Sequence, residues 1–478
     1  MPLSHLPAAL SARLSRIAGV LDRRPAPRLL RLLPGAPFAR GRRTVTSRFR
    51  AAGITDDFRP AYQALRAAGR RADALAYRLL GCALVPPMRR APGDRLLFAI
   101  DDTPTARYGP CVQGAGVHHN PTPGPAGEKF VYGHVWVTVA WLARHPLWHT
   151  LALPLRAPPY VRAKGVPELA EHYPRVFRTK LELAAEPVRR LPVWPGRTGK
   201  TLWMAVDGAF AKRPFLKPVL APGWVVFGRL RKDANPRGLP TTQRRRGQRG
   251  PPPTYGKDRI DPAKRAGRKR GWRRLECVRY GKRVVKTIKT FEAAWRPAGG
   301  RIRVAIVRGR DGWLAYFRTD PAVTAETILE VMADRGAIEQ TFKDVKEVWA
   351  AGRRQVRNVY ACVGAFAVNP CLYGVTEAWA WGRAEEGLPD RSRSPWDTGE
   401  RRPSHADKRK APQREILREE IRAVVGKRAE AEEFYDLATR LFDLAARTLV
   451  FHGKYRPLTT FTVFIVGIIC TTTGRTTA

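Results

Sequence analysis

The sequence predicts an α/β fold with a β-rich insertion in its middle and helical regions at both ends. Short apolar runs that stop at an aspartate are typical of the buried strands of a sheet, and they occur before residue 230. Residues 276–318 alternate between apolar and polar side chains, as antiparallel strands do. Leu and Ala recur at helical spacing among arginines in the first 90 residues, and helical patterns return after residue 320.

The charge of the chain indicates a polyanionic partner. It has 87 Lys and Arg residues against 41 Asp and Glu, which gives a formal net charge of +46. Such an excess makes a compact chain repel itself unless a polyanion supplies the counter-charge. A GC-rich coding sequence explains many arginines, but it does not explain so few carboxylates. We therefore expect nucleic acid as the partner rather than an anionic membrane surface.

Cysteine content and hydropathy favour a soluble cytoplasmic protein. The six cysteines include no close Cys-x-x-Cys pair, which argues against a disulfide framework and against a structural zinc site. The N-terminus carries Arg13 and Arg16 where a secretory signal needs an apolar core. The most apolar stretch, 461–470, is too short to cross a bilayer as a helix. We expect no membrane association.

The N-terminal region, 1–90, is predicted to be a small, basic, helical domain that binds DNA. A helical bundle whose exposed faces are merely rich in Arg is the alternative. Five strands follow, with a helix over 167–190 before the last two. Their predicted ranges are 95–100, 130–142, 149–155, 201–206 and 223–230. The first strand is expected to stop in a turn at Asp101-Asp102-Thr103-Pro104, and the fourth ends at Asp207.

Residues 231–275 differ from the rest, because they are rich in Arg, Lys, Gly and Pro and have almost nothing to bury. We expect an extended or disordered basic loop, in which contact with DNA phosphates would release counterions. A solvated loop without function is the alternative. The candidate DNA contacts here and just after Asp207 are Lys212, Arg244, Arg245, Arg246, Arg268, Lys269 and Arg270.

The region after the antiparallel strands is predicted to be helical. Helices are expected over 324–350 and 357–382, and a Pro/Ser/Arg linker at 387–411 leads to a charged amphipathic helix over 412–449. The chain therefore divides into an N-terminal domain (1–90), a core in two parts (91–230 and 321–385) around a basic loop and β-rich insertion (231–320), a linker with a C-terminal helical region (386–456), and an atypical tail (457–478).

Three carboxylates are the candidate catalytic groups. Asp101 or Asp102 and Asp207 follow buried strands, and Glu339 lies in a later helix. Phosphodiester chemistry with two divalent metal ions needs hard oxygen ligands from separate elements, and this order of strand, strand and helix supplies them. Taken singly, an aspartate at a strand end often only caps a turn.

The helix around Glu339 places charges beside the core. Arg335, Glu339 and Lys346 share one stripe of a helical wheel. An apolar stripe runs next to it, formed by Ile338, Phe342, Val345 and Trp349. A carboxylate flanked by two cations could hold a metal ion while the cations grip phosphates. An ordinary amphipathic helix with i,i+4 ion pairs is the alternative.

These residues resemble a known family. The spacing of Arg335, Glu339 and Lys346 matches the Arg-x3-Glu-x6-Lys part of the Tyr-x2-Arg-x3-Glu-x6-Lys signature of a large group of bacterial insertion-sequence DDE transposases. Met332 stands where that signature has Tyr. The strands LLFAIDDT and LWMAVDGAF look like the group's first-aspartate and second-aspartate strands, and a β-rich insertion occurs in the same place. The likeness covers roughly 90–385.

The resemblance implies an RNase H-like core and cut-and-paste transposition. It implies that Asp102, Asp207 and Glu339 bind two Mg²⁺ or Mn²⁺ ions, while Arg335 and Lys346 hold the DNA backbone near the scissile phosphate.

The first ligand is ambiguous, with Asp101 as the alternative to Asp102. We favour Asp102 because members of the group commonly have Asp-Thr here. Asp102 also shares a strand face with Leu96, Phe98 and Ile100.

The implied partner is double-stranded DNA, both the terminal inverted repeats of an element and its target. A homodimer in a synaptic complex, associated with the bacterial nucleoid, would bind it. Two alternatives stay open. One is a catalytically inactive remnant that only binds DNA, and the other is a related RNase H-like nuclease.

Overall fold

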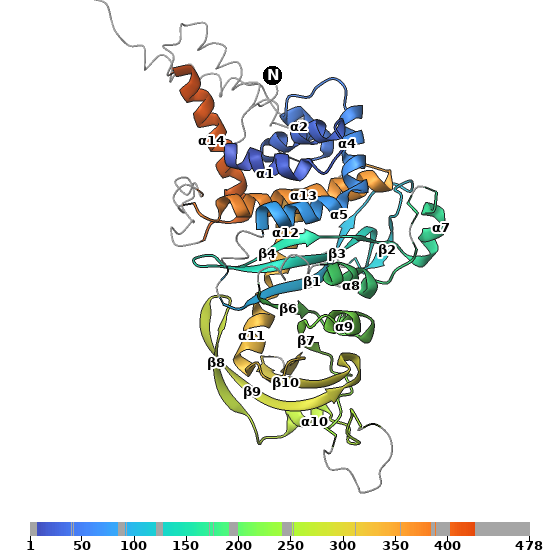
Figure 1. Cartoon of the computed structure of the whole chain (residues 1–478), viewed down its shortest axis with the longest axis vertical. Coiled ribbons are helices and arrows are strands. Elements are labelled where there is room, and N and C mark those ends of the chain that lie inside the picture. Colours follow the sequence, from blue (N-terminus) through green and yellow to red (C-terminus); the bar gives the residue numbers. More distant parts are fainter. Residues whose placement is uncertain are drawn as a thin grey trace, which may run out of the picture.

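The computed structural model describes residues 7–425, apart from 40, 42, 85–90, 92, 121–127, 172, 175, 191–198, 241–250, 252, 311, 354, 384–387 and 389–401. Its centre is a mixed sheet in the order β2-β3-β1-β6-β7-β11-β10-β9-β8, with β4 and β5 also paired to β3. Helices flank this sheet (Figure 1).

The core of the sheet has the strand arrangement of an RNase H-like fold. β1 (Arg95–Ala106) runs antiparallel to β3 (Phe130–His145), which pairs in turn with β4 (His149–Arg156). On its other side β1 is parallel to β6 (Thr201–Val206), and β6 is parallel to β7 (Val225–Leu230). The short strands β2 (Gly116–His119) and β5 (Pro159–Tyr160) pair with β3. The predicted α/β, RNase H-like class is confirmed.

Two sets of helices cover opposite faces of β1, β6 and β7 (Figure 1). One face carries α8 (Lys180–Arg190) and α9 (Arg213–Leu220), which pack against the even-numbered residues of β1 such as Phe98. The other carries α11 (Ala325–Asp334) and α12 (Ala337–Glu347). Ile338 and Phe342 of α12 pack there against Ala99 of β1. Successive strand residues therefore point to different helices.

The insertion continues the same sheet. Its strands are β8 (Arg273–Arg279), β9 (Lys282–Trp295), β10 (Gly300–Gly309) and β11 (Gly312–Arg318), all antiparallel to their neighbours. β11 joins the insertion to the core by pairing with β7. The β8–β9 hairpin turns at Tyr280 and Gly281, whose φ values of 52° and 77° are those of a two-residue turn that matches the twist of the strands. The prediction of antiparallel strands is confirmed.

The N-terminal region is helical, as predicted, and lies against a long apolar helix, α13 (Val359–Ala380) (Figure 1). Its helices are α1 (Ala8–Ala18), α2 (Pro25–Phe38), α3 (Val45–Ala51), α4 (Arg59–Arg70) and α5 (Ala72–Leu79), followed by a π-helical turn at Leu80–Leu84. Gly69 and Gly364 let α4 and α13 touch, because a Cβ on either would lie within 2 Å of a carbonyl oxygen of the other helix. Among the described helices only α13 is long and apolar enough to cross a membrane, and its burial makes it a core helix.

Buried polar groups fix the end of the helix that carries Glu339. The indole nitrogen of Trp349 donates to Nε2 of His405 at 2.6 Å, and Arg48 of α3 donates to the Trp349 carbonyl oxygen. His405 and Lys408, in α14 (His405–Val425), both bond Glu377 of α13 at 2.6 Å. Although burial alone would raise it, Lys408 and His405 hold the pKa of Glu377 at about 2. α12 is thus tied to both terminal regions.

The predicted bounds of two strand and loop segments are wrong. β1 does not stop at a turn after Ile100 but continues to Ala106 along β3. Because β6 pairs with β1 only as far as Ile100, the rest of β1 has no strand partner on that side among the described residues, and Pro104 is tolerated there. The basic segment 231–275 also contains a helix, α10 (Pro262–Gly267), which Asp261 caps by accepting from two backbone amides.

Three predicted helices also differ. The range 167–190 holds α7 (Val166–Leu169) and α8, and Thr179 and Glu182 form a capping box at the start of α8. The helix over 324–350 is interrupted at Arg335 and Gly336, between α11 and α12. α14 begins at His405, inside the predicted linker, because Ser404 and Asp407 cap it reciprocally. The rest of the predicted helix, beyond 425, lies outside the described residues.

Candidate active site

Asp101 and Asp207 lie side by side at one edge of the sheet. In the parallel pair of β1 and β6, Ala99 is level with Ala205 and Ile100 with Val206. Asp101 and Asp207 are the next residues of the two chains, so they point to the same face about 4.8 Å apart along the sheet. That face is the one covered by α11 and α12, since Ala99 and Ala205 pack there.

Asp102 points to the opposite face. Its carboxylate accepts from Nζ of Lys180, the first residue of α8, at 2.7 Å. Asp102 shares its face with Leu96, Phe98 and Ile100, as the sequence predicts. That face is covered by α8 and α9, whereas Glu339 lies on the other side of the sheet. The geometry therefore favours Asp101 over Asp102 as the partner of Asp207 and Glu339.

Arg335 connects Glu339 to this pair of aspartates. One guanidinium nitrogen of Arg335 lies 2.6 Å from Oδ2 of Asp101, and the other lies 3.2 Å from Oε1 of Glu339. The Arg335 side chain is 12% exposed, whereas Glu339, in the first turn of α12, is 66% exposed. A single cation thus bridges the carboxylates of β1 and α12, which are 238 residues apart in the chain.

The environment of Asp101 opposes its ionisation. Burial raises the pKa of Asp101 to about 6, even though the Arg335 guanidinium and the backbone amide of Asp102 lower it. The neighbouring carboxylates of Asp102 and Asp207 raise it further. A site where burial and like charges disfavour a carboxylate is one that an additional cation would stabilise.

Metal binding is therefore expected to weaken below pH 6. A divalent ion competes with the proton on Asp101, so the affinity for Mn²⁺ should fall roughly tenfold per pH unit as the pH drops below the pKa of about 6 and stay flat above it. The stability of the metal-free chain changes in the opposite direction. Its folded state binds this proton more tightly than the unfolded state does, so the contribution of Asp101 to the free energy of unfolding rises as the pH falls through 6.

Titration of the full chain with Mn²⁺ between pH 5 and 7.5, followed by calorimetry, measures this dependence. Asp101→Asn is the matched control, because it removes the titrating group. A wild-type affinity that is the same at pH 5 and pH 7 would contradict the position given to Asp101.

The three carboxylates offer the donor set that Mg²⁺ and Mn²⁺ prefer, namely hard oxygens from separate elements. Asp101 and Asp207 are adjacent, and the Arg335 guanidinium lies between Asp101 and Glu339. Within the described ranges, no three Asp, Glu, His or Cys side chains already converge as ligands of one ion. The residues present fit the group, provided that Glu339 exchanges its ion pair with Arg335 for the metal.

The predicted DNA contacts lie in different places. Lys346 is on α12, two turns from Glu339, and is half-buried, which lowers its pKa. Lys212 is exposed at the start of α9, on the other face of the sheet. Arg268, Lys269 and Arg270 are exposed directly after α10. Arg244, Arg245 and Arg246 lie outside the described residues.

The signature position Met332 is partly buried in this chain and packs against the core. Met332 packs against the cluster of Trp203, Ala205 and Phe227 beneath α11. Tyr316 of β11 packs against the same cluster, and its hydroxyl is close enough for the charge of Arg335 to act on it. Tyr316 could not be recognised from the sequence, because its position beside Arg335 depends on the pairing of β11 with β7.

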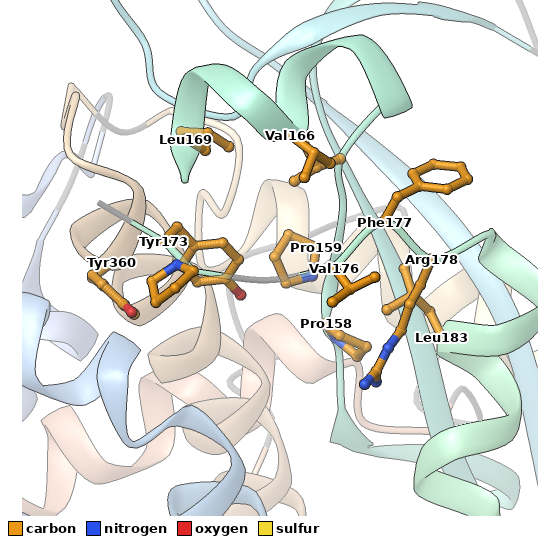
Figure 2. Close-up of a pocket in the computed structure, with 12 residues that line it drawn as sticks. Pro158, Pro159, Val166, Leu169, Tyr173, Val176, Phe177, Arg178, Leu183 and Tyr360 are labelled. Atoms are coloured by element: carbon orange, nitrogen blue, oxygen red, sulfur yellow. The ribbon is translucent and has the colours of Figure 1, made fainter. Parts of the chain in front are cut away.

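A cavity of about 480 Å³ lies elsewhere, among Pro158, Tyr173, Phe177, Leu183 and Tyr360 (Figure 2). Its lining residues include none of the acidic residues described above. This cavity therefore does not extend the candidate site.

Comparison with known families identifies the family of the chain. Residues 17–291, more than half of the chain, match the family described as DDE superfamily endonuclease. The matched range contains Asp101 and Asp207 and ends before Glu339. No curated protein matches the chain. The chain belongs to the DDE superfamily endonucleases.

Proposed function

We propose that the chain is a DNA transposase that excises and inserts an element by metal-dependent cleavage and strand transfer. The observation that carries the proposal is the arrangement of Asp101 beside Asp207, with Arg335 linking Asp101 to Glu339. The spacing of Arg335, Glu339 and Lys346 further supports the insertion-sequence group with the Tyr-Arg-Glu-Lys signature.

We assign Asp101, Asp207 and Glu339 as ligands of two Mg²⁺ or Mn²⁺ ions. Bound ions of this kind activate an attacking water or 3′-hydroxyl and stabilise the leaving oxygen of a phosphodiester. Arg335 serves as the counter-ion of the ligands while they are free of metal, and it then becomes available to a DNA phosphate. Asp102, which pairs with Lys180, supports the local fold of β1 and α8.

The proposed partners are the terminal inverted repeats of the element and its target DNA. A net charge of +46 suits a polyanion of this size. Two ends are joined in one reaction, so we propose a homodimer that acts at the bacterial nucleoid in the cytoplasm.

A plasmid test separates this proposal from its alternatives. A supercoiled plasmid carrying both ends of the element is incubated with the full chain and Mg²⁺ or Mn²⁺. Excision at the ends supports the transposase. Nicking without end specificity would instead indicate a related nuclease, and binding without cleavage an inactive remnant, and either result would overturn the proposal.

Lys346→Ala is expected to weaken DNA binding by removing a phosphate contact. The slope of log affinity against log salt concentration should become shallower by roughly 0.9, because one fewer counterion is released. Lys343→Ala is the matched control, since Lys343 is an exposed lysine on the same helix. Equal slopes for the wild type and Lys346→Ala would place Lys346 away from the DNA.

A further inference from the structure

The row that holds the two aspartates continues across the sheet with other polar residues. In the parallel pair of β6 and β7, Ala205 is level with Phe227 and Val206 with Gly228. The next residues of the two strands, Asp207 and Arg229, therefore lie side by side. Their closeness is consistent with the 3.9 Å between the Arg229 Cβ and the position that a Cβ would take on Gly208, the residue after Asp207. Tyr316 of β11 lies directly opposite Arg229. Asp101, Asp207, Arg229 and Tyr316 thus share one row on one face.

This row changes from acidic to basic over a few ångströms. Each strand adds about 4.8 Å, so Arg229 is one step beyond Asp207 and Tyr316 is two steps beyond it. Arg229 is exposed and Tyr316 is half-buried, with its ring on the cluster beneath α11. Neither side chain has a hydrogen bond or an ion pair with another described residue. Both are thus available to a ligand.

The tip of the β8–β9 hairpin brings further donors to the row. The charge of Arg279 acts on the Tyr316 hydroxyl, as do those of Arg229 and Arg335. Nε of Arg279 and Nε of Arg335 are buried and have no hydrogen-bond partner among the described residues. Tyr280, at the tip of the hairpin, lies next to Arg335. Its hydroxyl is 3.6 Å from the position that a Cβ would take on Gly336, the residue after Arg335.

We propose that Arg229, Tyr316 and Arg279 form an anion-binding site that holds the backbone phosphate adjoining the phosphodiester at Asp101, Asp207 and Glu339. The ligand is a phosphodiester because guanidinium groups and a phenol offer the forked and single donors that phosphate oxygens accept. The inference rests on the proposed function for its substrate and adds the residues that fix the register of the DNA strand.

The insertion has a role in this arrangement. β11 and the β8–β9 hairpin supply two of the three donors, while β7 of the core supplies the third. The β-rich insertion therefore completes the substrate site rather than only extending the sheet.

Tyr316→Phe tests the phenol with least disturbance, because it removes one hydroxyl and leaves the packed ring. Affinity of the full chain for a duplex ending in the element's terminal repeat should fall roughly tenfold, the usual effect of a hydrogen bond to a charged group. The salt dependence should stay unchanged, because the phenol is neutral. Unchanged affinity in a variant that melts at the wild-type temperature would remove Tyr316 from the site.

Arg229→Gln tests the charge and locates it on the DNA. Binding is measured without divalent ions, using duplexes in which one phosphate at a time is a neutral methylphosphonate. The affinity of the wild type should fall when the phosphate beside the cleaved bond is the neutral one. The affinity of Arg229→Gln should be the same for this duplex as for the unmodified duplex. Arg308→Gln is the matched control, because Arg308 is exposed on the opposite face of the same sheet and should remain additive at that phosphate.

Additive effects of Arg229→Gln at every phosphate near the cut would overturn the inference. The proposed function is judged separately, by whether the wild-type chain excises the element from a plasmid. Excision without the coupling rejects the phosphate site alone. Coupling without excision keeps the site and rejects the transposase.

Discussion

Replacing Glu339 with Gln is expected to lower DNA cleavage by on the order of a thousandfold, the scale at which one lost charge-stabilising group affects catalysis. DNA binding without divalent ions should change little. Glu339 is 66% exposed and makes its one described ion pair with Arg335, so the substitution removes a metal ligand while the core of α12 stays packed. Plasmid cleavage and duplex binding, measured on the same preparation, separate the two effects.

Glu347→Gln is the control for this variant. Glu347 is an exposed glutamate at the other end of α12, so the change in charge is the same and the distance from the aspartates is larger. Cleavage by Glu347→Gln should match the wild type. Cleavage that survives Glu339→Gln would remove Glu339 from the metal site.

Asp101→Asn and Asp102→Asn are expected to behave in opposite ways. Asp101→Asn should abolish cleavage on the same scale as Glu339→Gln, because the missing charge faces Asp207. It should not reduce the melting temperature of the metal-free chain. Burial disfavours the ionised form of Asp101, which is why its pKa is raised to about 6, and the substitution removes that charge.

Asp102→Asn removes only the ion pair with Lys180, whose side chain is 38% exposed. Such a pair contributes little, so cleavage should stay within about threefold of the wild type. Rates of plasmid cleavage by the two variants decide between the neighbouring aspartates. Loss of activity in Asp102→Asn with retention in Asp101→Asn would reverse our assignment.

The sequence predicted the elements that carry the site better than the faces to which they point. Apolar runs ending at Asp101 and Asp207 were recognisable, because buried parallel strands need continuous apolar residues. The choice between Asp101 and Asp102 was not decidable in this way, since consecutive residues of a strand point to opposite faces. Only the packing of Ala99 against α12 and of Phe98 against the other layer identifies the face of Glu339.

The basic side of the site was beyond prediction for a related reason. Arg229 and Tyr316 are 87 residues apart and meet only because β11 pairs with β7 in one register. A shift of one residue in that pairing would send Tyr316 to the opposite face. Similarly, Arg335 was expected to grip phosphate, but the structure pairs it with Asp101, a residue far away in sequence.

The central claim is that Asp101, Asp207 and Glu339 meet around shared metal ions, and iron-directed cleavage of the protein tests it most directly. Fe²⁺ replaces Mg²⁺ in the full chain, and the hydroxyl radicals that it generates with ascorbate and peroxide cut the backbone near the bound ion. We expect cuts close to residues 101, 207 and 339 together, all suppressed by excess Mg²⁺. Cuts near the two aspartates without any near Glu339, or cuts that Mg²⁺ does not suppress, would contradict the account.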